Sequence, residues 1–205
     1  MKYDLTDKNS IYSYAKDLEG KSFRNLCDAY YSVNEDFYSM RAEDAVESYV
    51  NIKKKGSLGE LVEEMYFNYK ANSISKADFP EAGVELKVTP YKTNKNGSIS
   101  AKERLIISMI DYMEIVNMTF FSSNAWEKIK NILLVYYEWS PEIIDKLDYI
   151  IRYVYMYSPV KEDLEIIKSD FYKIKQKVMN GEAHLLSEGD TLYLGAATKS
   201  ATSKN

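Results

Sequence analysis

The chain has 205 residues, of which 45% are hydrophobic and 28% are charged, and these proportions are ordinary for a single globular domain. Its one cysteine excludes an internal disulfide and a metal site built from several cysteines, and its apolar runs are too short to cross a membrane. The net charge of −4 argues mildly against a nucleic-acid binder, which usually carries an electropositive footprint.

The N-terminal region shows helical patterns and no signal peptide. Its first residues lack the apolar core that a secretion signal needs, so we expect a cytoplasmic protein without a membrane partner. Residues 9–19 are amphipathic, with Asn9 or Ser10 as the expected N-cap and Gly20 as the stop. Residues 22–32 repeat apolar side chains at helical spacing and predict a second helix.

Two further segments precede the most informative part of the chain. Residues 34–50 favour a helix by composition, and we interpret them as an insertion with a short helix of its own. Residues 56–69 carry apolar side chains every three or four positions, which predicts an amphipathic helix. By this pattern alone, Glu63 is an acidic residue on the solvent face of that helix.

Residues 84–91 predict a β-strand that carries an acid and a base on one face. β-Branched and apolar residues fill this stretch, and a glycine and a proline punctuate its ends. Because side chains alternate along a strand, Glu85 and Lys87 point to the same side, while Leu86 points into the core. Asp78 enters from the turn just before the strand.

Two carboxylates and one ammonium that meet at the end of a strand form a set suited to Mg²⁺. This ion takes one or two protein carboxylates and completes its shell with water and phosphate oxygens. The lysine can then lower the cost of a developing hydroxide and of negative charge at phosphorus. The pattern therefore predicts phosphoryl chemistry, although acid-x-lysine pairs also occur by chance on surface strands.

A turn and a group of basic residues follow the strand. Asn94 to Gly97 is a turn signal, because Asn-Gly favours positive φ. We expect this turn to join residues 84–92 to a neighbouring antiparallel strand at residues 104–111. The basic residues form either a local basic cleft on an acidic protein or a set of solvated side chains. They are Lys53, Lys54, Lys55, Lys87, Lys92, Lys95, Lys102, Arg104, Lys128, Lys130 and Lys199.

The C-terminal half predicts two strands and a long helix. Residues 124–130 predict a turn into a strand at residues 131–138. Residues 149–157 predict an aromatic strand, which we interpret as core packing rather than a platform for stacking bases. Pro159 is expected at the first position of a long helix that ends at Asn180-Gly181.

The strand and the turn before it resemble the active site of a nuclease family. Asp78, Glu85 and Lys87 have the spacing of the PD-(D/E)xK nucleases. The run from Glu81 to Lys87, followed by Thr89 and Pro90, closely resembles the active-site strand of the MutH family.

Other segments agree with this resemblance in order and spacing. The run at residues 55–63, Lys-Gly-Ser-Leu-Gly-Glu-Leu-Val-Glu, is similar to the MutH pattern. The run at residues 100–105, Ser-Ala-Lys-Glu-Arg-Leu, is more similar to the Sau-type restriction endonucleases, which cut at GATC, than to MutH itself. The resemblance covers roughly residues 52–199.

The resemblance implies a role for each member of the site. Asp78 and Glu85 would hold Mg²⁺, and Lys87 would orient or deprotonate the attacking water. Glu63 falls where the family places an additional active-site glutamate, so it would complete the outer coordination or polarise a water.

The resemblance also implies basic residues that face the substrate. Lys128 matches the second lysine of the family site, with Lys130 as the near alternative. A lysine that deters pairing at a strand edge fits this position equally. Lys102, Arg104, Lys130 and Lys199 are the expected DNA-binding residues.

The segment at residues 181–199 resembles the family's recognition region, where a strand and the loop after it face DNA. Lys199 matches a lysine of that region. Ala197 stands where MutH has an arginine, so the family's base contacts do not carry over to this position.

The implied fold is α/β, with a restriction-endonuclease-like, mixed and mostly antiparallel central sheet flanked by helices. The implied function is that of a type II restriction endonuclease, which hydrolyses double-stranded DNA with Mg²⁺, most simply at GATC. Two alternatives are a non-cleaving DNA-binding effector module and a MutH-like mismatch-repair nicking endonuclease. An effector module is expected to have lost the acid-x-lysine pair, which this chain keeps.

We expect residues 1–205 to be a single MutH-like catalytic domain, the N-terminal part of a longer enzyme. Family members continue past the polar stretch at residues 199–205, and Sau-type enzymes carry a second MutH-like domain. The expected partners are therefore double-stranded DNA and either that second domain or a second copy on the DNA.

Overall fold

The chain folds into two compact units, each with its own hydrophobic core. The computed structural model describes residues 2–33, 57–69 and 76–197. The first unit comprises residues 1–106 and 131–157, and the second comprises residues 107–130 and 158–205. That residues 1–205 act as one catalytic domain stays a prediction, and the possible insertion at residues 34–50 lies outside the described residues.

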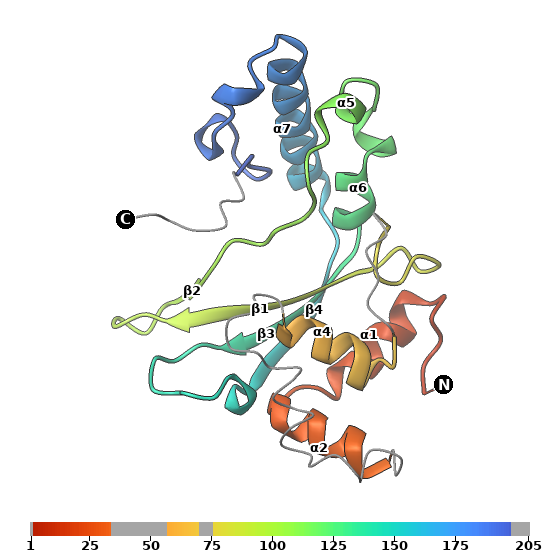
Figure 1. The fold of residues 1–205 in the computed structure, drawn as a ribbon, viewed down its shortest axis with the longest axis vertical. Coiled ribbons are helices and arrows are strands. Elements are labelled where there is room, and N and C mark those ends of the chain that lie inside the picture. Colours follow the sequence, from red (N-terminus) through yellow and green to blue (C-terminus); the bar gives the residue numbers. More distant parts are fainter. Residues whose placement is uncertain (1, 34–56, 70–75, 198–205) are drawn as a thin grey trace. The chain divides into compact units, whose positions relative to one another are not determined.

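The first unit is built on a four-stranded sheet with the order β2-β1-β3-β4 (Figure 1). Its strands are β1 (Glu85–Thr93), β2 (Ile99–Ala101), β3 (Ile132–Glu138) and β4 (Ile151–Tyr157), and a 3-10 turn, η4 (Lys146–Asp148), precedes β4. β1 runs parallel to β3, whereas β1 with β2 and β3 with β4 are antiparallel. Helices α1 (Lys8–Lys16), α2 (Phe23–Val33) and α4 (Ser57–Leu61) gather on one side of the sheet (Figure 1). The expected α/β fold with a mixed, mostly antiparallel sheet is confirmed.

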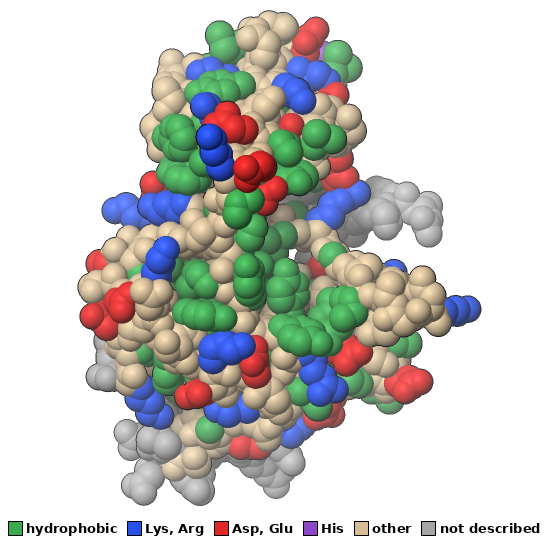
Figure 2. Space-filling model, turned by 180° about the vertical axis from the view of Figure 1, so that it is seen from behind, with side chains coloured by type: hydrophobic (Ala, Val, Ile, Leu, Met, Phe, Trp, Pro, Cys, Tyr) green, Lys and Arg blue, Asp and Glu red, His purple; other side chains and the backbone are tan. Residues whose placement is uncertain are grey.

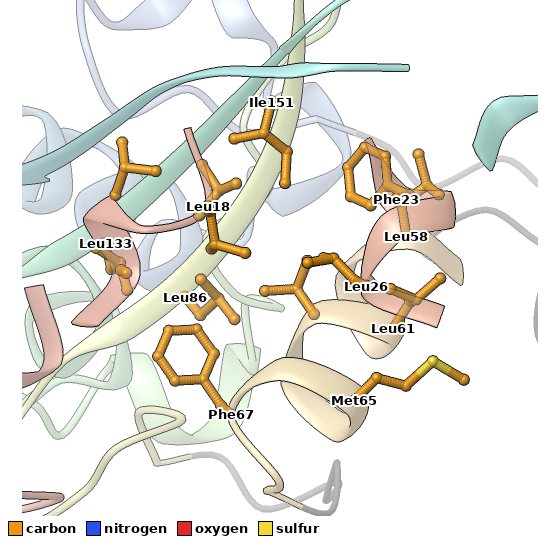
Figure 3. Packing of buried hydrophobic residues seen from close by; sticks show 14 of the residues in the cluster. Leu18, Phe23, Leu26, Leu58, Leu61, Met65, Phe67, Leu86, Leu133 and Ile151 are labelled. Carbon is orange, nitrogen blue, oxygen red and sulfur yellow. The ribbon is translucent and has the colours of Figure 1, made fainter. Parts of the chain in front are cut away.

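The core of this unit lies between the sheet and these helices. Leu86 of β1 is 3% exposed, as the alternating pattern predicts. Figure 3 shows it in one cluster with Leu133 of β3 and Leu61 of α4. Because Leu86 faces the core, Glu85 and Lys87 lie on the opposite face of the sheet.

The helix predicted at residues 56–69 forms in two parts. The α-helix α4 continues directly into a π-helical segment, η2 (Val62–Tyr66), which the periodic pattern does not reveal. The segment ends where the Tyr69 N–H donates to the Glu63 carbonyl oxygen over 2.9 Å and Asn68 takes a positive φ. Short π-helical segments are rare and often occur at functional sites.

The strand predicted at residues 104–111 does not form, so this prediction is wrong. The antiparallel partner of β1 is β2, and residues 104–110 have no regular secondary structure. The Gly97 N–H donates to the Asn94 carbonyl oxygen over 2.9 Å, and Gly97 has a positive φ. Because this turn is so tight, the chain pairs with β1 again at Ile99, well before residue 104.

Two helix starts also differ from the prediction. The N-cap of α1 is Asp7 rather than Asn9 or Ser10, because the Asp7 carboxylate accepts the Asn9 N–H over 2.9 Å. The long helix α7 (Lys161–Met179) begins two residues after Pro159. Val160 is extended, so helical geometry starts only beyond it. The predicted second helix and the stop of α7 at Asn180-Gly181 are confirmed, and Gly181 has a positive φ. The helix α1 ends earlier than predicted, at Lys16 with Asp17 as its C-cap, so Gly20 is not its stop.

The second unit is helical and packs around α7. It also contains α5 (Tyr112–Ile115), α6 (Asn124–Ile129) and three 3-10 turns, η3 (Phe120–Ser122), η5 (Ala183–Leu185) and η6 (Glu188–Asp190). Its buried core consists of Ile115, Phe120, Ile129, Ile167, Phe171, Ile174 and Ala196. Among the described residues of the whole chain, every helix is too short or too polar to cross a membrane.

The turn predicted at residues 124–130 is wrong, because this stretch forms α6. The Ser123 hydroxyl caps the helix by accepting the Trp126 N–H over 3.2 Å. Ile129 is 4% exposed and joins the core of the second unit. A cap and a buried side chain at helical spacing together favour helix over turn.

The aromatic strand at residues 149–157 is only partly core. Ile151 and Val154 are buried, but Tyr153 and Tyr155 are 52% and 57% exposed. The interpretation of these two tyrosines as core packing is therefore wrong.

The strand implied by the resemblance of residues 181–199 to the recognition region does not form in the described part, residues 181–197. Asp170 of α7 holds this segment instead. It is fully buried, and its Oδ2 accepts the N–H groups of Leu192, Tyr193 and Leu194 over 3.1, 2.7 and 3.2 Å. These three donors are the groups that a strand would use to pair with a neighbour.

Asp170→Asn is expected to lower the free energy of unfolding of the second unit by about 1–3 kcal/mol, because three hydrogen bonds lose their charged acceptor. Urea unfolding followed by circular dichroism measures this change. Glu165→Gln on the same helix is the matched control, since Glu165 is exposed. Equal stability of the two variants would contradict the role given to Asp170.

Candidate functional site

The site begins with an ion pair on β1. The Lys87 Nζ lies 2.6 Å from the Glu85 Oε1, and the two side chains are 24% and 1% exposed. Their proximity follows from the strand, which places alternate residues side by side on one face. The ammonium balances a carboxylate that is otherwise removed from water, and it remains the accessible member of the pair.

A tight hairpin brings Asp78 to the same strand. Phe79 and Val84 exchange backbone hydrogen bonds of 2.9 and 3.1 Å, and Gly83 between them has a positive φ. The chain folds back on itself, so the Asp78 Oδ2 accepts the Leu86 N–H over 2.8 Å. This hairpin explains physically why seven positions in sequence separate two carboxylates that lie near one another.

The π-helical segment η2 adds Glu63 to this group. Burial, together with the nearby carboxylates of Asp78 and Glu85, raises the pKa of Glu63 to about 7, while Lys87 acts in the opposite direction. The structure therefore brings all four predicted residues within electrostatic reach of one another. The interpretation of Glu63 from periodicity alone, as a solvated helix acid, is wrong.

The raised pKa of Glu63 predicts a pH-dependent stability. Between about pH 4.5 and 7 the folded protein keeps a proton on Glu63 that the unfolded chain has released. The stability contributed by this group is thus present below pH 4.5 and is lost as pH rises through about 7. Glu63→Gln is neutral at every pH, so its melting temperature relative to the wild type should rise across this window and then level off.

Thermal melting of both proteins between pH 4 and 8.5 measures this difference. Glu64→Gln is the matched control, because it makes the same change at the next position of η2. A Glu63→Gln curve that runs parallel to the wild-type curve at all pH values would contradict the burial of Glu63 beside Asp78 and Glu85.

Of the remaining predicted residues, Lys102 and Arg104 belong to the first unit and Lys128 and Lys130 to the second. Lys128 lies on α6 in the second unit, and Lys130 follows that helix, with its Nζ 2.6 Å from the Glu127 Oε2. Lys102 places its Nζ 4.6 Å from the centre of the Trp139 ring. Arg104 is exposed in the irregular stretch after β2. Their roles stay predictions, and Lys199 and Lys53 to Lys55 lie outside the described residues.

One positioning residue was missed by the sequence analysis. The Asn131 carbonyl oxygen accepts the Glu85 N–H over 3.0 Å, and its Nδ2 donates to the Gly83 carbonyl oxygen over 3.2 Å. Asn131 therefore fixes the start of β1 against β3. In the sequence, Asn131 is a polar residue directly before the apolar strand β3. A strand pattern does not show which strand lies beside β1, so it could not predict that Asn131 contacts Glu85.

The donor set suits a hard divalent cation. Asp78 and Glu85 supply carboxylate oxygens, which Mg²⁺ prefers. Burial raises the pKa of Glu63 most, and the carboxylates of Asp78 and Glu85 add to this effect; a cation would relieve their repulsion. In the part of the chain that the structure describes, acidic, histidine and cysteine side chains do not come together in threes as a metal site. Two carboxylates still match a Mg²⁺ site completed by water and substrate oxygens.

Comparisons with known proteins identify relatives of the chain. The family described as "DNA mismatch repair enzyme MutH" matches residues 67–170, a span that includes Asp78, Glu85, Lys87 and Lys128. The chain is 41% identical over 155 residues to the type II restriction enzyme Sau3AI of Staphylococcus aureus, which covers 75% of this chain.

Two MutH proteins match more of the chain at lower identity. The DNA mismatch repair proteins MutH of Vibrio parahaemolyticus serotype O3:K6 (strain RIMD 2210633) and Vibrio campbellii (strain ATCC BAA-1116) are each 24% identical over 197 residues. These matches cover 95% of this chain and 78% of each MutH protein. The match to Sau3AI, in contrast, spans 31% of that enzyme.

Proposed function

The chain belongs to the MutH family and has its restriction-endonuclease-like fold, and from this premise we propose that it is a Mg²⁺-dependent endonuclease that hydrolyses phosphodiester bonds of double-stranded DNA. The observation that carries this proposal is the buried Glu85 paired with Lys87 at 2.6 Å, on the strand that Asp78 also contacts. An acid, a second acid and a lysine in this arrangement suit phosphoryl transfer to water.

Each residue of the site has a proposed part in the reaction. Asp78 and Glu85 hold the cation, which when bound supplies Lewis-acid stabilisation of charge on the phosphate. Lys87 orients the attacking water and stabilises negative charge as the bond to phosphorus forms. Glu63 polarises a water at this site. Lys128 supports the phosphate.

We propose the restriction type of activity, with GATC as the target sequence. The 41% identity to a type II restriction enzyme supports this type over mismatch repair, for which the identity is 24%. The observation that favours a MutH-like nickase is that the MutH match extends over 95% of this chain, whereas the Sau3AI match extends over 75%.

A palindromic target needs two cutting events, one on each strand. The described part of the chain holds one set of Asp78, Glu85 and Lys87. The proposed partner is therefore a second copy of the chain or a second MutH-like domain on the same DNA. Lys102, Arg104, Lys130 and Lys199 are the proposed contacts to that DNA.

Incubation of supercoiled plasmid with the protein tests the proposal. A plasmid with GATC sites should be nicked or linearised in Mg²⁺ and left intact in EDTA, and a plasmid of equal size without GATC should survive in both. Linear product supports the restriction type, and an accumulated nicked circle supports the nickase. Binding of GATC DNA without cleavage in Mg²⁺ would instead identify a non-cleaving effector module.

A further inference from the structure

The strand register places two tyrosines of β4 on the same face of the sheet as Lys87. Lys87 pairs with Leu134 of β3, and Leu134 pairs with Tyr155 of β4. Tyr153 lies two positions before Tyr155 and therefore shares its face. We refer to Tyr153 and Tyr155 as the tyrosine row. It lies two strand spacings from Lys87, or about 10 Å.

The side chains of the tyrosine row are exposed to solvent and do not belong to the hydrophobic core of the first unit. The opposite face of β4 carries Val154, which is 3% exposed and belongs to the hydrophobic core, whereas Tyr153 and Tyr155 are 52% and 57% exposed. The Tyr153 ring lies 5.7 Å from the Tyr91 ring of β1, which confirms that the face is continuous across the sheet. Figure 2 shows side chains of the green class, which includes tyrosine, gathered over the part of the molecule that holds the sheet.

We propose that the tyrosine row binds the sugar–phosphate backbone of the duplex beside the phosphate that is cleaved. This inference rests on the proposed function, because a duplex with one phosphate at Lys87 must continue over the neighbouring surface. A distance of about 10 Å corresponds to about three base-pair rises, so the row meets the same duplex a few nucleotides from the reacting bond. Tyrosine hydroxyls donate to phosphate oxygens, and the rings pack against the sugars.

The charges beside the row are compatible with a phosphate backbone. Glu138 of β3 lies at this end of the sheet, but its carboxylate is held by Arg152 at 3.4 Å and by the Thr93 hydroxyl at 3.0 Å. Arg152 is the additional residue at the irregularity between β3 and β4, where Tyr136 pairs with Tyr153 and Tyr137 with Ile151. A hydrogen bond from a tyrosine hydroxyl to a phosphate oxygen does not require a charged protein side chain to lose its water.

The test compares phenylalanine and alanine variants of the row. Tyr153→Phe with Tyr155→Phe removes only the two hydroxyls and should weaken binding of a GATC duplex in Ca²⁺ about tenfold, by the net worth of two hydrogen bonds. The alanine pair should weaken binding further, because the rings are also lost. Both losses should be equal for duplexes with and without GATC, and the salt dependence of binding should stay unchanged, since no charge is removed.

Tyr112→Ala is the matched control, because Tyr112 is 49% exposed and belongs to the second unit. Circular dichroism melting checks that each variant folds. If the wild type neither binds nor cuts DNA, the proposed function itself fails. If the wild type binds and cuts but the phenylalanine and alanine pairs bind as tightly as the control, only the role of the tyrosine row is overturned. Unchanged DNA binding with an altered sedimentation coefficient would show that the row contacts protein and would also overturn it.

Discussion

Glu85→Gln is expected to slow cleavage of GATC plasmid by about 10²–10³-fold or more, while binding of a GATC duplex in Ca²⁺ survives. The Glu85 side chain is 1% exposed and lies 2.6 Å from the Lys87 Nζ. Glutamine keeps the shape of the side chain but loses the charge that would hold the cation and balance Lys87. Single-turnover cleavage in Mg²⁺ and fluorescence anisotropy in Ca²⁺ measure the two effects separately.

Glu81→Gln is the matched control for this variant, because Glu81 is exposed in the hairpin that precedes β1. It should cut at the wild-type rate. Asp78→Asn should resemble Glu85→Gln, since both carboxylates are proposed to hold the same ion. Near-normal cleavage by a folded Glu85→Gln protein would remove Glu85 from the metal site.

Lys87→Ala is expected to lower the cleavage rate by about 10²–10³-fold with nearly unchanged affinity for DNA. At 24% exposure, the Lys87 ammonium is the accessible member of its ion pair and is the group proposed to act on the water. An interaction made only in the transition state affects the rate and not the binding of the substrate. The ratio of the two effects therefore separates a catalytic lysine from a phosphate-binding lysine.

Lys92→Ala is the control for Lys87→Ala. Lys92 lies on the same strand at an odd number of positions from Lys87, so it points to the other face of the sheet. A phosphate contact at Lys87 would instead weaken binding to all sequences and lower the salt slope by about one unit. That result would assign Lys87 to substrate binding and leave the activation of water to another group.

The sequence determined those parts of the fold that depend on local patterns. Alternation over residues 84–91 was sufficient to predict β1 and the shared face of Glu85 and Lys87. Apolar periodicity was likewise sufficient for α1, α2 and α7. Motif spacing also predicted that Asp78, Glu85 and Lys87 lie close together, because a short hairpin and a single strand connect them. Their roles stay predictions.

Predictions from local patterns failed where contacts with residues far away in the sequence determine the secondary structure. The stretch at residues 124–130 becomes helix because Ile129 is buried in a core that includes residues of α7. The stretch at residues 191–197 is kept out of a sheet because a carboxylate some twenty positions earlier takes its N–H groups, as the contact from Asp170 to Leu192 shows. In both cases the contacting residues of α7 are too far away in the sequence for a local pattern to include them.

The tertiary structure alone decided the electrostatics of the site and the character of its surroundings. Glu63 has a raised pKa because η2 partly buries it and places it near the carboxylates of Asp78 and Glu85. Tyr153 and Tyr155 are exposed because the helices of the first unit cover the other face of the sheet. The burial of a side chain and the distances between charged groups depend on how helices and strands pack together. Neither can be deduced from a local amino-acid pattern.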